Sequence, residues 1–556
     1  MVTPLYKIRV VFIFLLLCCA YSTIIMKLYY VQVRHAHYFA SLGNRQYSVR
    51  HTQALERALI YDRHHNPLVI NVSHPSACIT PRQLQDTTRM IQLLEDNFPA
   101  AARRLHEQPD TGYLYIQRHL TEEERLRLEE AHIPDIFFIN EPGRFYTVPS
   151  LGPLIGITNA DNEGAFGIER VYNTQLQGSA TEYTVKRDAR NRQQLYFEKQ
   201  VNQVGASGEP LTLTIDSNLQ AIAYEELRSS IGKFNAREGA VIIMDAATGE
   251  ILACASYPDF DPNHTRSLCI DHTKNRVFAE TYEFGSIIKV FLALAALAEK
   301  IVTPDTLIDC HNTQHIVLHS MRINNWRADG TIPFSEVIMR SNNIGTAQVA
   351  YLLQERLYTH YRACGFGTKA GLLPEEQAGY ITPPHTWTPQ SYASLSYGYE
   401  ISATLLQLAC GFCMIARNGI PVHPSIIRDE LPPLQPTEPI YSADVIDQIH
   451  QMLTQTITHG TAYKAHIAGY HIMGKTGTAN ILEDGVYQPN KNLFTFAGII
   501  LQGEYKRVIA TFIKEINVPG PQLYASAVSA PLFERIAERM LIQEKITPRL
   551  SINSMG

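Results

Sequence analysis

The sequence predicts an α+β protein with an N-terminal transmembrane helix and at least two further domains. A chain of 556 residues exceeds the size of one hydrophobic core, so more than one domain is expected. An almost unbroken apolar run lies near the N-terminus. Five strand-like segments form two groups, which a long and mostly helical insertion separates. Hydrophobic residues make up 45% and charged residues 18% of the chain, which is typical of a globular protein with a membrane segment.

The predicted membrane anchor is the apolar run from Val10 to Met26, which continues past Lys27 to Val31. A membrane span needs about 20 residues, so the run is long enough, and the lysine side chain can reach the interface. A cleaved signal peptide is the alternative, but no small-x-small cleavage site follows the run. We therefore predict that residues 1–32 form a short tail and a retained anchor. Basic residues lie on both sides of the run, so charge does not orient it.

The composition gives no indication of a nucleic-acid partner, a metal or a cofactor. The net charge of −5 gives no electrostatic case for nucleic acid. The cysteines beyond the anchor are scattered and odd in number, so no disulfide framework is predicted. Cys410 and Cys413 form a C-x-x-C that could be redox-active or half of a zinc site. They lie in the helix-like run Leu405–Ala416 without a second ligand pair, which favours small buried side chains.

The region after the anchor, Val33 to about Pro210, is mixed and irregular in pattern. It contains a charged stretch, Thr121–Ala131, whose Glu and Arg spacing predicts a solvated helix. Leu211–Ile215 alternates like a strand and leads to Asp216, a plausible N-cap for a helix over Ser217–Leu227. We take 33–210 as the first domain, 211–545 as the second, and 546–556 as a C-terminal tail.

The second domain is predicted to be an antiparallel sheet with helices against it. Its strands are rich in β-branched residues, and a turn-like segment (D-A-A-T-G-E) joins the first two. The predicted strands are Val241–Met244, Ile251–Ala255, His471–Thr478, Phe494–Leu501 and Val508–Lys514, followed by a helix from about Ala527 to Leu541.

Three short motifs in the second domain point to its chemistry. Ser286 to Lys289 reads S-I-I-K, Ser341 to Asn343 reads S-N-N, and Lys475 to Thr478 reads K-T-G-T. A serine with a lysine three residues later, a Ser-x-Asn and a Lys-Thr-Gly, in this order, are the parts of a penicillin-reactive acyl-transfer site. Each motif alone is weak, because Ser230 also begins an S-x-x-K and Ser551 an S-x-N, and only the order and context distinguish them.

The first motif has the properties of an activated nucleophile. Residues 287–297 are apolar except for Lys289, which predicts a buried helix beginning at Ser286. Three-residue spacing puts both side chains on one helical face, close enough for direct proton transfer. A serine attacks well only when a base takes its proton, and burial together with nearby Lys475 would keep the Lys289 amine neutral. The alternative is a capping serine with an exposed lysine, which the apolar surroundings disfavour.

The third motif has a rival interpretation. Gly469 to Thr476 formally matches G-x-x-x-x-G-K-[ST], the phosphate-binding loop. That loop requires a helix that opens at its Lys-Thr. Here the middle residues are bulky, the run alternates like a strand, and Asp484-Gly485 and Pro489 follow it, so a nucleotide site is disfavoured.

The chain resembles the class B penicillin-binding proteins, the monofunctional peptidoglycan transpeptidases, and within them the division-specific branch. Besides the three motifs, four segments carry the resemblance: residues 56–63 (E-R-A-L-I-Y-D-R), 164–169 (G-A-F-G-I-E), 245–253 (D-A-A-T-G-E-I-L-A) and 396–399 (S-Y-G-Y). The resemblance implies a serine β-lactamase-like fold for the second domain. It also implies that residues 33–210 form an elongated pedestal or dimerisation-like domain. Phe284 stands where the family usually has proline, but no reacting group is lost.

The resemblance implies roles for the first two motifs. Ser286 would be the nucleophile and Lys289 its base. Ser341 would relay a proton toward the leaving amine, and Asn343 would hydrogen-bond the amide of the substrate. Without the other motifs, a loop and helix cap would be the default interpretation of S-N-N.

The third motif would form an edge strand that lines the cleft. Lys475, Thr476 and Thr478 can bind a substrate carboxylate through charge and hydroxyl donors. Gly477 would let the substrate approach the backbone closely. The resemblance implies an oxyanion hole made by the backbone N–H groups of Ser286 and Thr478.

The function that the resemblance implies is a membrane-anchored D,D-transpeptidase that cross-links the D-Ala-D-Ala stem peptides of peptidoglycan in septal cell-wall synthesis, with β-lactams as inhibitors. The catalytic domain would lie on the periplasmic face of the bacterial inner membrane. A polytopic glycosyltransferase and other division proteins would be its partners. Two alternatives remain open: a D,D-carboxypeptidase of the same fold, and a non-catalytic divisome scaffold or β-lactam sensor.

Overall fold

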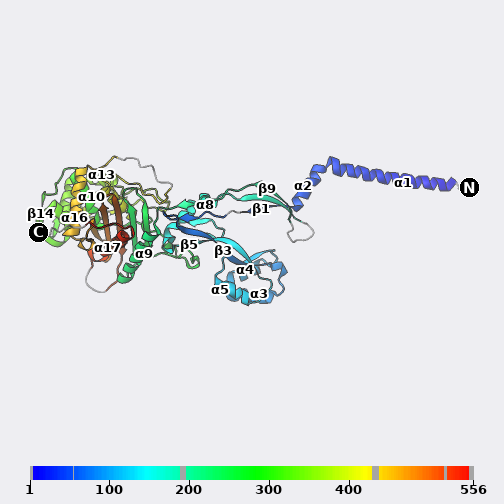
Figure 1. Ribbon diagram of the computed structural model, residues 1–556, viewed down its shortest axis with the longest axis horizontal. Coiled ribbons are helices and arrows are strands. Elements are labelled where there is room, and N and C mark those ends of the chain that lie inside the picture. The colour runs from blue at the N-terminus through cyan, green and yellow to red at the C-terminus, as the bar shows by residue number, and fades with distance from the viewer. Residues whose placement is uncertain (1–3, 54–55, 188–195, 429–437, 519–522, 550–556) are drawn as a thin grey trace. The chain divides into compact units, whose positions relative to one another are not determined.

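The computed structural model describes residues 4–53, 56–187, 196–428, 438–518 and 523–549 (Figure 1). The chain forms two compact units: residues 1–58 with 177–209, and residues 59–176 with 210–556. The second S-x-N sequence, at Ser551, lies outside the described residues. The domain boundaries at 32, 210 and 545 remain predictions.

The first unit contains the predicted apolar helix and a three-stranded antiparallel sheet. One continuous helical segment, Leu5–Arg34, is long and apolar enough to cross a membrane, and its apolar window is not buried in the protein. Such a surface is stable only if another apolar medium covers it, as a bilayer does. The strands are in the order β1-β8-β9. The elements are α1 (Pro4–Tyr29), a π turn (Tyr30–Arg34), α2 (Ala36–Tyr47), β1 (Ser48–Gln53), β8 (Thr181–Arg187) and β9 (Tyr196–Gln203).

The second unit begins with a five-stranded sheet in the order β10-β2-β3-β4, in which β5 also pairs with β3. The predicted charged helix is α5, and Thr121 and Glu124 form a capping box at its N-terminus. The strands are β2 (Ile60–Tyr61), β3 (Pro67–Ile79), β4 (Leu114–Gln117), β5 (Phe137–Tyr146) and β10 (Leu211–Thr212), with a hairpin of β6 (Ile157–Thr158) and β7 (Gly164–Phe166). The helices are α3 (Thr87–Asn97), α4 (Pro99–Glu107), α5 (Glu122–Glu130), α6 (Gly152–Ile155), α7 (Gly167–Val171) and α8 (Asn173–Gln177).

The predicted five-stranded antiparallel sheet is confirmed, in the order β12-β11-β19-β18-β17. β17 is therefore an edge strand. The sheet joins strands from both ends of the domain, because every residue of β11 pairs with a residue of β19. Its strands are β11 (Glu238–Asp245), β12 (Ile251–Tyr257), β17 (His471–Glu483), β18 (Val486–Gln502) and β19 (Tyr505–Lys514).

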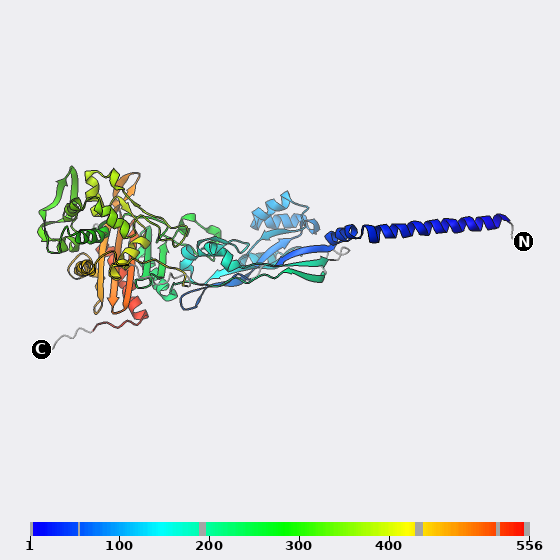
Figure 2. The ribbon, with the colours of Figure 1, turned by 90° about the horizontal axis from the view of Figure 1, so that it is seen from above.

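Helices cover both faces of this sheet (Figures 1 and 2). On one face α9 and α17 pack on alternate residues of the strands, including Val241 and Ile243. α15 lies against β11, β18 and β19, and α16 lies against β17. Asp216 caps α9 as predicted, because its carboxylate accepts the backbone N–H groups of Asn218 and Leu219. These helices are α9 (Ser217–Phe234), α15 (Leu405–Ala416), α16 (Ala443–Thr458) and α17 (Ala525–Gln543).

The segment between β12 and β17 is helical only in part, so the expectation of a mostly helical insertion is wrong for residues 307–333. Here β13 and β14 form a long antiparallel hairpin. Its strand pattern is weak because the hairpin is half exposed and polar, with few β-branched residues in a row. The remaining elements are α10 (Lys289–Ala298), β13 (Leu307–Leu318), β14 (Met321–Pro333), α11 (Phe334–Met339), α12 (Asn343–Leu353), α13 (Arg356–Ala363), β15 (Tyr380–Ile381), α14 (Pro389–Ser396) and β16 (Ile401–Ser402).

Candidate active site

Ser286 lies in a tight turn between a loop and a buried helix. The turn is a 3₁₀ segment, Gly285–Ile288, and α10 itself begins at Lys289, three residues later than the sequence predicts. All of α10 from Lys289 to Leu297 is buried, as its apolar pattern predicts. The serine side chain therefore stands at the N-terminal end of a rigid, buried helix, where the helix dipole favours negative charge.

Two glycines allow this turn to lie directly against β17. A Cβ on Gly477 would be 2.3 Å from the carbonyl oxygen of Phe284, and a Cβ on Gly285 would be 2.7 Å from that of Thr478. Gly285 also has φ +60°, a conformation that favours glycine. Close approach at Gly477 is thus made by the Gly285–Ile288 turn of the chain itself, whereas the sequence suggested approach by substrate. The backbone N–H groups of Ser286 and Thr478 consequently belong to neighbouring segments.

Lys289 connects α10 to the second motif. Its Nζ lies 2.7 Å from the carbonyl oxygen and 3.2 Å from Oγ of Ser341, and 2.5 Å from Oδ1 of Asn343. The side chain is completely buried. Burial, with a smaller contribution from the charge of Lys475, lowers the pKa of Lys289 well below its usual value. Nζ faces three oxygen acceptors here, and a neutral amine would keep one lone pair with which to accept a proton.

The described contacts differ from the predicted proton path in one respect. The amine of Lys289 is hydrogen-bonded to the second motif, and no hydrogen bond between it and the Ser286 hydroxyl is present among the described residues. Catalytic hydrogen bonds are often long before substrate binds, so this geometry is compatible with a base role. Ser341 lies in the turn between α11 and α12, and Asn343 is the first residue of α12.

The third motif forms part of the edge strand β17. Because Lys475 and Thr476 lie within this strand, no helix opens at them, and the phosphate-loop interpretation is wrong. Lys475 is fully buried, and this burial lowers its pKa to about 7. Its Nζ donates to the carbonyl oxygen of Thr476 at 3.1 Å. The Thr478 hydroxyl accepts the backbone N–H of Ala525 at 3.1 Å, which leaves its own proton free to donate to a ligand.

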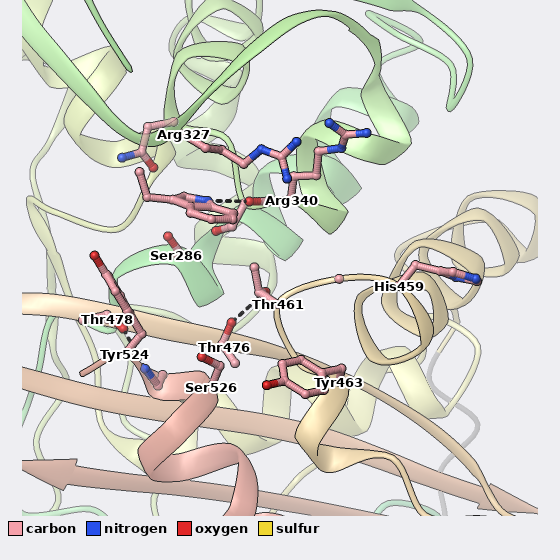
Figure 3. Close-up of a pocket in the computed structure, with 15 residues that line it drawn as sticks. Ser286, Arg327, Arg340, His459, Thr461, Tyr463, Thr476, Thr478, Tyr524 and Ser526 are labelled. Atoms are coloured by element: carbon pink, nitrogen blue, oxygen red, sulfur yellow. Dashed lines mark hydrogen bonds between the residues drawn. The ribbon is translucent and has the colours of Figure 1, made fainter. Parts of the chain in front are cut away.

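The three motifs meet at one cavity of about 420 Å³ (Figure 3). The motif residues that line it are Ser286, Ser341, Asn343, Thr476 and Thr478. Lys289 and Lys475 are fully buried beside them. The sequence missed the other walls, since no short motif marks them: Trp326, Arg327 and Arg340, residues 459–461 and Tyr463, and residues 524–526. This volume suits a small peptide or a β-lactam.

The serine of the second S-x-x-K sequence and the two cysteines of the C-x-x-C sequence have structural roles. Ser230 is buried in α9, and its hydroxyl accepts a hydrogen bond from Arg535 at 2.8 Å. Cys410 and Cys413 lie on α15, where burial raises the pKa of both thiols. A thiol that stays protonated is a poor nucleophile and metal ligand, so both cysteines act as packing residues.

Glu283, just before the Gly285–Ile288 turn, should make stability depend on pH. Its Oε1 accepts the Glu400 N–H at 2.8 Å and the Tyr487 hydroxyl at 3.1 Å, and burial raises its pKa to about 7. The folded state therefore favours the protonated acid, so the stability that Glu283 contributes is greatest at low pH and is lost as the pH rises from the ordinary carboxyl pKa to about 7. We expect Glu283→Gln, which cannot ionise, to raise the free energy of unfolding by about 1–3 kcal/mol at pH 8 and by little at pH 5.

Thermal unfolding of both proteins at the two pH values measures this difference. Glu504→Gln is the matched control, because Glu504 is exposed in the turn between β18 and β19. An equal gain from Glu283→Gln at pH 5 and pH 8 would contradict the prediction.

Comparison with known proteins identifies the family. Residues 239–538, more than half of the chain, match the penicillin binding protein transpeptidase domain, and residues 52–213 match the penicillin-binding protein dimerisation domain. The probable peptidoglycan D,D-transpeptidase PbpC of Pseudomonas aeruginosa is 28% identical over 560 residues, covering 97% of this chain and 95% of that protein. The peptidoglycan D,D-transpeptidase FtsI of Escherichia coli (strain K12) is 26% identical over 506 residues, covering 88% and 84%.

Solved structures agree with this result. The transpeptidase domain of Burkholderia pseudomallei penicillin-binding protein 3 is 30% identical, with a TM-score of 0.54, and covers 60% of this chain and 97% of that one. A peptidoglycan synthetase from Bifidobacterium adolescentis has a TM-score of 0.70 over 90% of this chain and 97% of its own, at 19% identity, and shows the shared fold. The chain belongs to the penicillin-binding protein transpeptidase family, as a class B member of its division-type branch.

Proposed function

We propose that this protein is a serine-type D-Ala-D-Ala transpeptidase that cross-links peptidoglycan stem peptides and is acylated by β-lactams. The observation that carries the proposal is the position of Lys289. Its buried amine touches Ser341 and Asn343, and its helix begins next to Ser286, in one cavity with the edge strand of Thr476 and Thr478. Proteins of this family act on peptidoglycan stem peptides and bind β-lactams, which agrees with this arrangement.

In the proposed reaction, Ser286 Oγ attacks the carbonyl carbon of the penultimate D-Ala. The Oγ proton passes to the neutral amine of Lys289, and the backbone N–H groups of Ser286 and Thr478 bind the oxyanion. The C–N bond then breaks, and the departing D-Ala nitrogen receives a proton through the Ser341 hydroxyl. An amine of a second stem peptide attacks the acyl-enzyme, loses its proton to the same relay, and releases Ser286.

Substrate position would be set by the remaining site residues. Lys475, Thr476 and Thr478 would hold the terminal carboxylate of the donor stem through a charge and two hydroxyl groups. The side chain of Lys475, on β17, is buried, and a bound carboxylate would favour its protonated form. Asn343 would orient the peptide amide, since its own amide is fixed by Lys289 and by the backbone of β14.

The proposal includes a cellular setting. The chain is membrane-anchored through the N-terminal apolar helix. We infer that the catalytic domain lies on the periplasmic face of the inner membrane, where the substrate is. We also infer that a polytopic glycosyltransferase and other division proteins are its partners in septal wall synthesis. The names of relatives such as FtsI support this role.

Product analysis of the full chain in detergent tests the activity. A donor ending in D-Ala-D-Ala, incubated with an acceptor amine, should release D-Ala and yield the amide-linked product, as measured by mass spectrometry. Hydrolysis alone, despite a saturating acceptor, would indicate a D,D-carboxypeptidase. If neither product formed and Ser286→Ala restored septation in depleted cells, a scaffold role would replace this proposal.

A further inference from the structure

Ser341 adopts a backbone conformation that a residue with a side chain normally avoids. Its φ is +59°, in the left-handed region, although it is not a glycine. This conformation presents its carbonyl oxygen and its hydroxyl to the same atom, Nζ of Lys289, at 2.7 and 3.2 Å. Strained residues persist only where their surroundings hold them. The residues that hold Ser341 therefore determine whether the amine and the hydroxyl meet.

One buried carboxylate holds the residues on both sides of Ser341. Asp329 lies on β14, and its side chain is fully buried. Its Oδ1 accepts Nη1–H of Arg340 at 2.8 Å and pairs with Nε of Arg327 at 2.9 Å. Its Oδ2 accepts Nδ2–H of Asn342 at 3.0 Å. The two oxygens thus fix the residues immediately before and after Ser341.

The same strand also fixes the rest of the second motif. The Asn325 side chain accepts the backbone N–H of Asn343 at 3.1 Å, a group that the start of α12 would otherwise leave without a partner. The carbonyl oxygen of Asn324 accepts Nδ2–H of Asn343 at 2.7 Å, which turns Oδ1 of Asn343 toward Lys289. Trp326 donates its ring N–H to the carbonyl oxygen of Arg340 at 3.0 Å. β14 therefore supports residues 340–343, which contain the second motif.

We propose that Asp329 is a positioning residue for acyl transfer: by binding Arg340 and Asn342 it holds Ser341 in the left-handed conformation that keeps the Ser341 hydroxyl against Lys289. The inference rests on the proposed function and adds a residue to it. Asp329 does not act on substrate, because its carboxylate is buried and is occupied by three partners. Its effect on the reaction should pass through Ser341.

A double-mutant cycle on the full chain in detergent tests this inference. Asp329→Asn keeps the shape of the side chain but removes its charge, so the pair with Arg340 is weakened. We expect the rate of penicillin acylation to fall about 30-fold in Asp329→Asn, with the dissociation constant for penicillin changed less than about threefold. In a Ser341→Ala background the same change should lower the rate less than about threefold, because the hydroxyl that Asp329 positions is already absent.

Asp309→Asn is the matched control, because Asp309 is an exposed aspartate on the other strand of the hairpin. It should acylate like the wild type. Should Asp329→Asn fail to fold in a melting experiment, Arg340→Gln is the second variant. Arg340→Gln removes the positive charge that pairs with Asp329. It should lower the rate of penicillin acylation about tenfold in the wild-type background but not in the Ser341→Ala background.

The outcomes separate this inference from the proposed function. A wild-type rate in Asp329→Asn, or an equal loss in the Ser341→Ala background, would overturn the positioning role while leaving the transpeptidase proposal intact. Failure of the wild-type protein itself to acylate would overturn both.

Discussion

Ser286→Ala is expected to abolish the covalent adduct that a penicillin forms with this protein, whereas Ser230→Ala should leave the adduct unchanged. Of these two serines, Ser286 lines the cavity that the three motifs share, three residues before the buried Lys289, whereas Ser230 is buried in α9. Removing an activated nucleophile lowers the rate by about 10⁴-fold or more, because no other group can form the acyl-enzyme. Intact-mass spectrometry after incubation with a penicillin measures the adduct directly.

Ser230 is the control serine in this comparison. Ser230 belongs to an S-x-x-K sequence of its own, so it controls for any conclusion drawn from the motif alone. It is buried and hydrogen-bonded to Arg535, on the outer helix α9. If the adduct persisted in Ser286→Ala, or disappeared in Ser230→Ala, the assignment of Ser286 as the nucleophile would be wrong. Lack of any adduct in folded wild-type protein would favour the scaffold role.

The sequence predicted the central sheet and the meeting of the motifs because both depend on strong local signals. The strand Phe494–Leu501 is rich in β-branched and aromatic residues, and the apolar helix after Ser286 contains one lysine, so each pattern strongly favours a single structure. The order of the three motifs then placed them in one site through a family resemblance. Propensity alone would have interpreted Ser341 to Asn343 as a loop and cap.

The parts that the sequence missed depend on contacts between distant residues. The hairpin β13–β14 has a weak strand pattern. Its Asp329 holds the two neighbours of Ser341, and no rule of sequence spacing relates Asp329 to that motif. The left-handed backbone of Ser341 is likewise invisible in a Ser-Asn-Asn sequence. The role of Gly477 was only half predicted. A close approach was expected, but its partner, the carbonyl oxygen of Phe284, belongs to a segment far earlier in the chain.

Lys289→Met is expected to lower the rate of penicillin acylation by about 10²–10⁴-fold without unfolding the protein. Methionine has a similar length and is apolar, so it suits a site where the lysine is fully buried and the charged form is disfavoured. The loss comes from the missing lone pair that would accept the proton of Ser286. In the wild type, the rate should also fall as the pH drops and the Lys289 amine becomes protonated, whereas Lys289→Met should lack this dependence.

Lys233→Met is the matched control, because Lys233 is the exposed lysine of the second S-x-x-K sequence, on α9. Adduct formation is followed by mass spectrometry over pH 5–9, and thermal unfolding reports whether each variant is folded. If Lys289→Met reacted at the wild-type rate, the base would have to be another group of the site. A slow, pH-independent reaction in this variant alone would show that the buried amine removes the proton, and that its burial is what makes it a base near neutral pH.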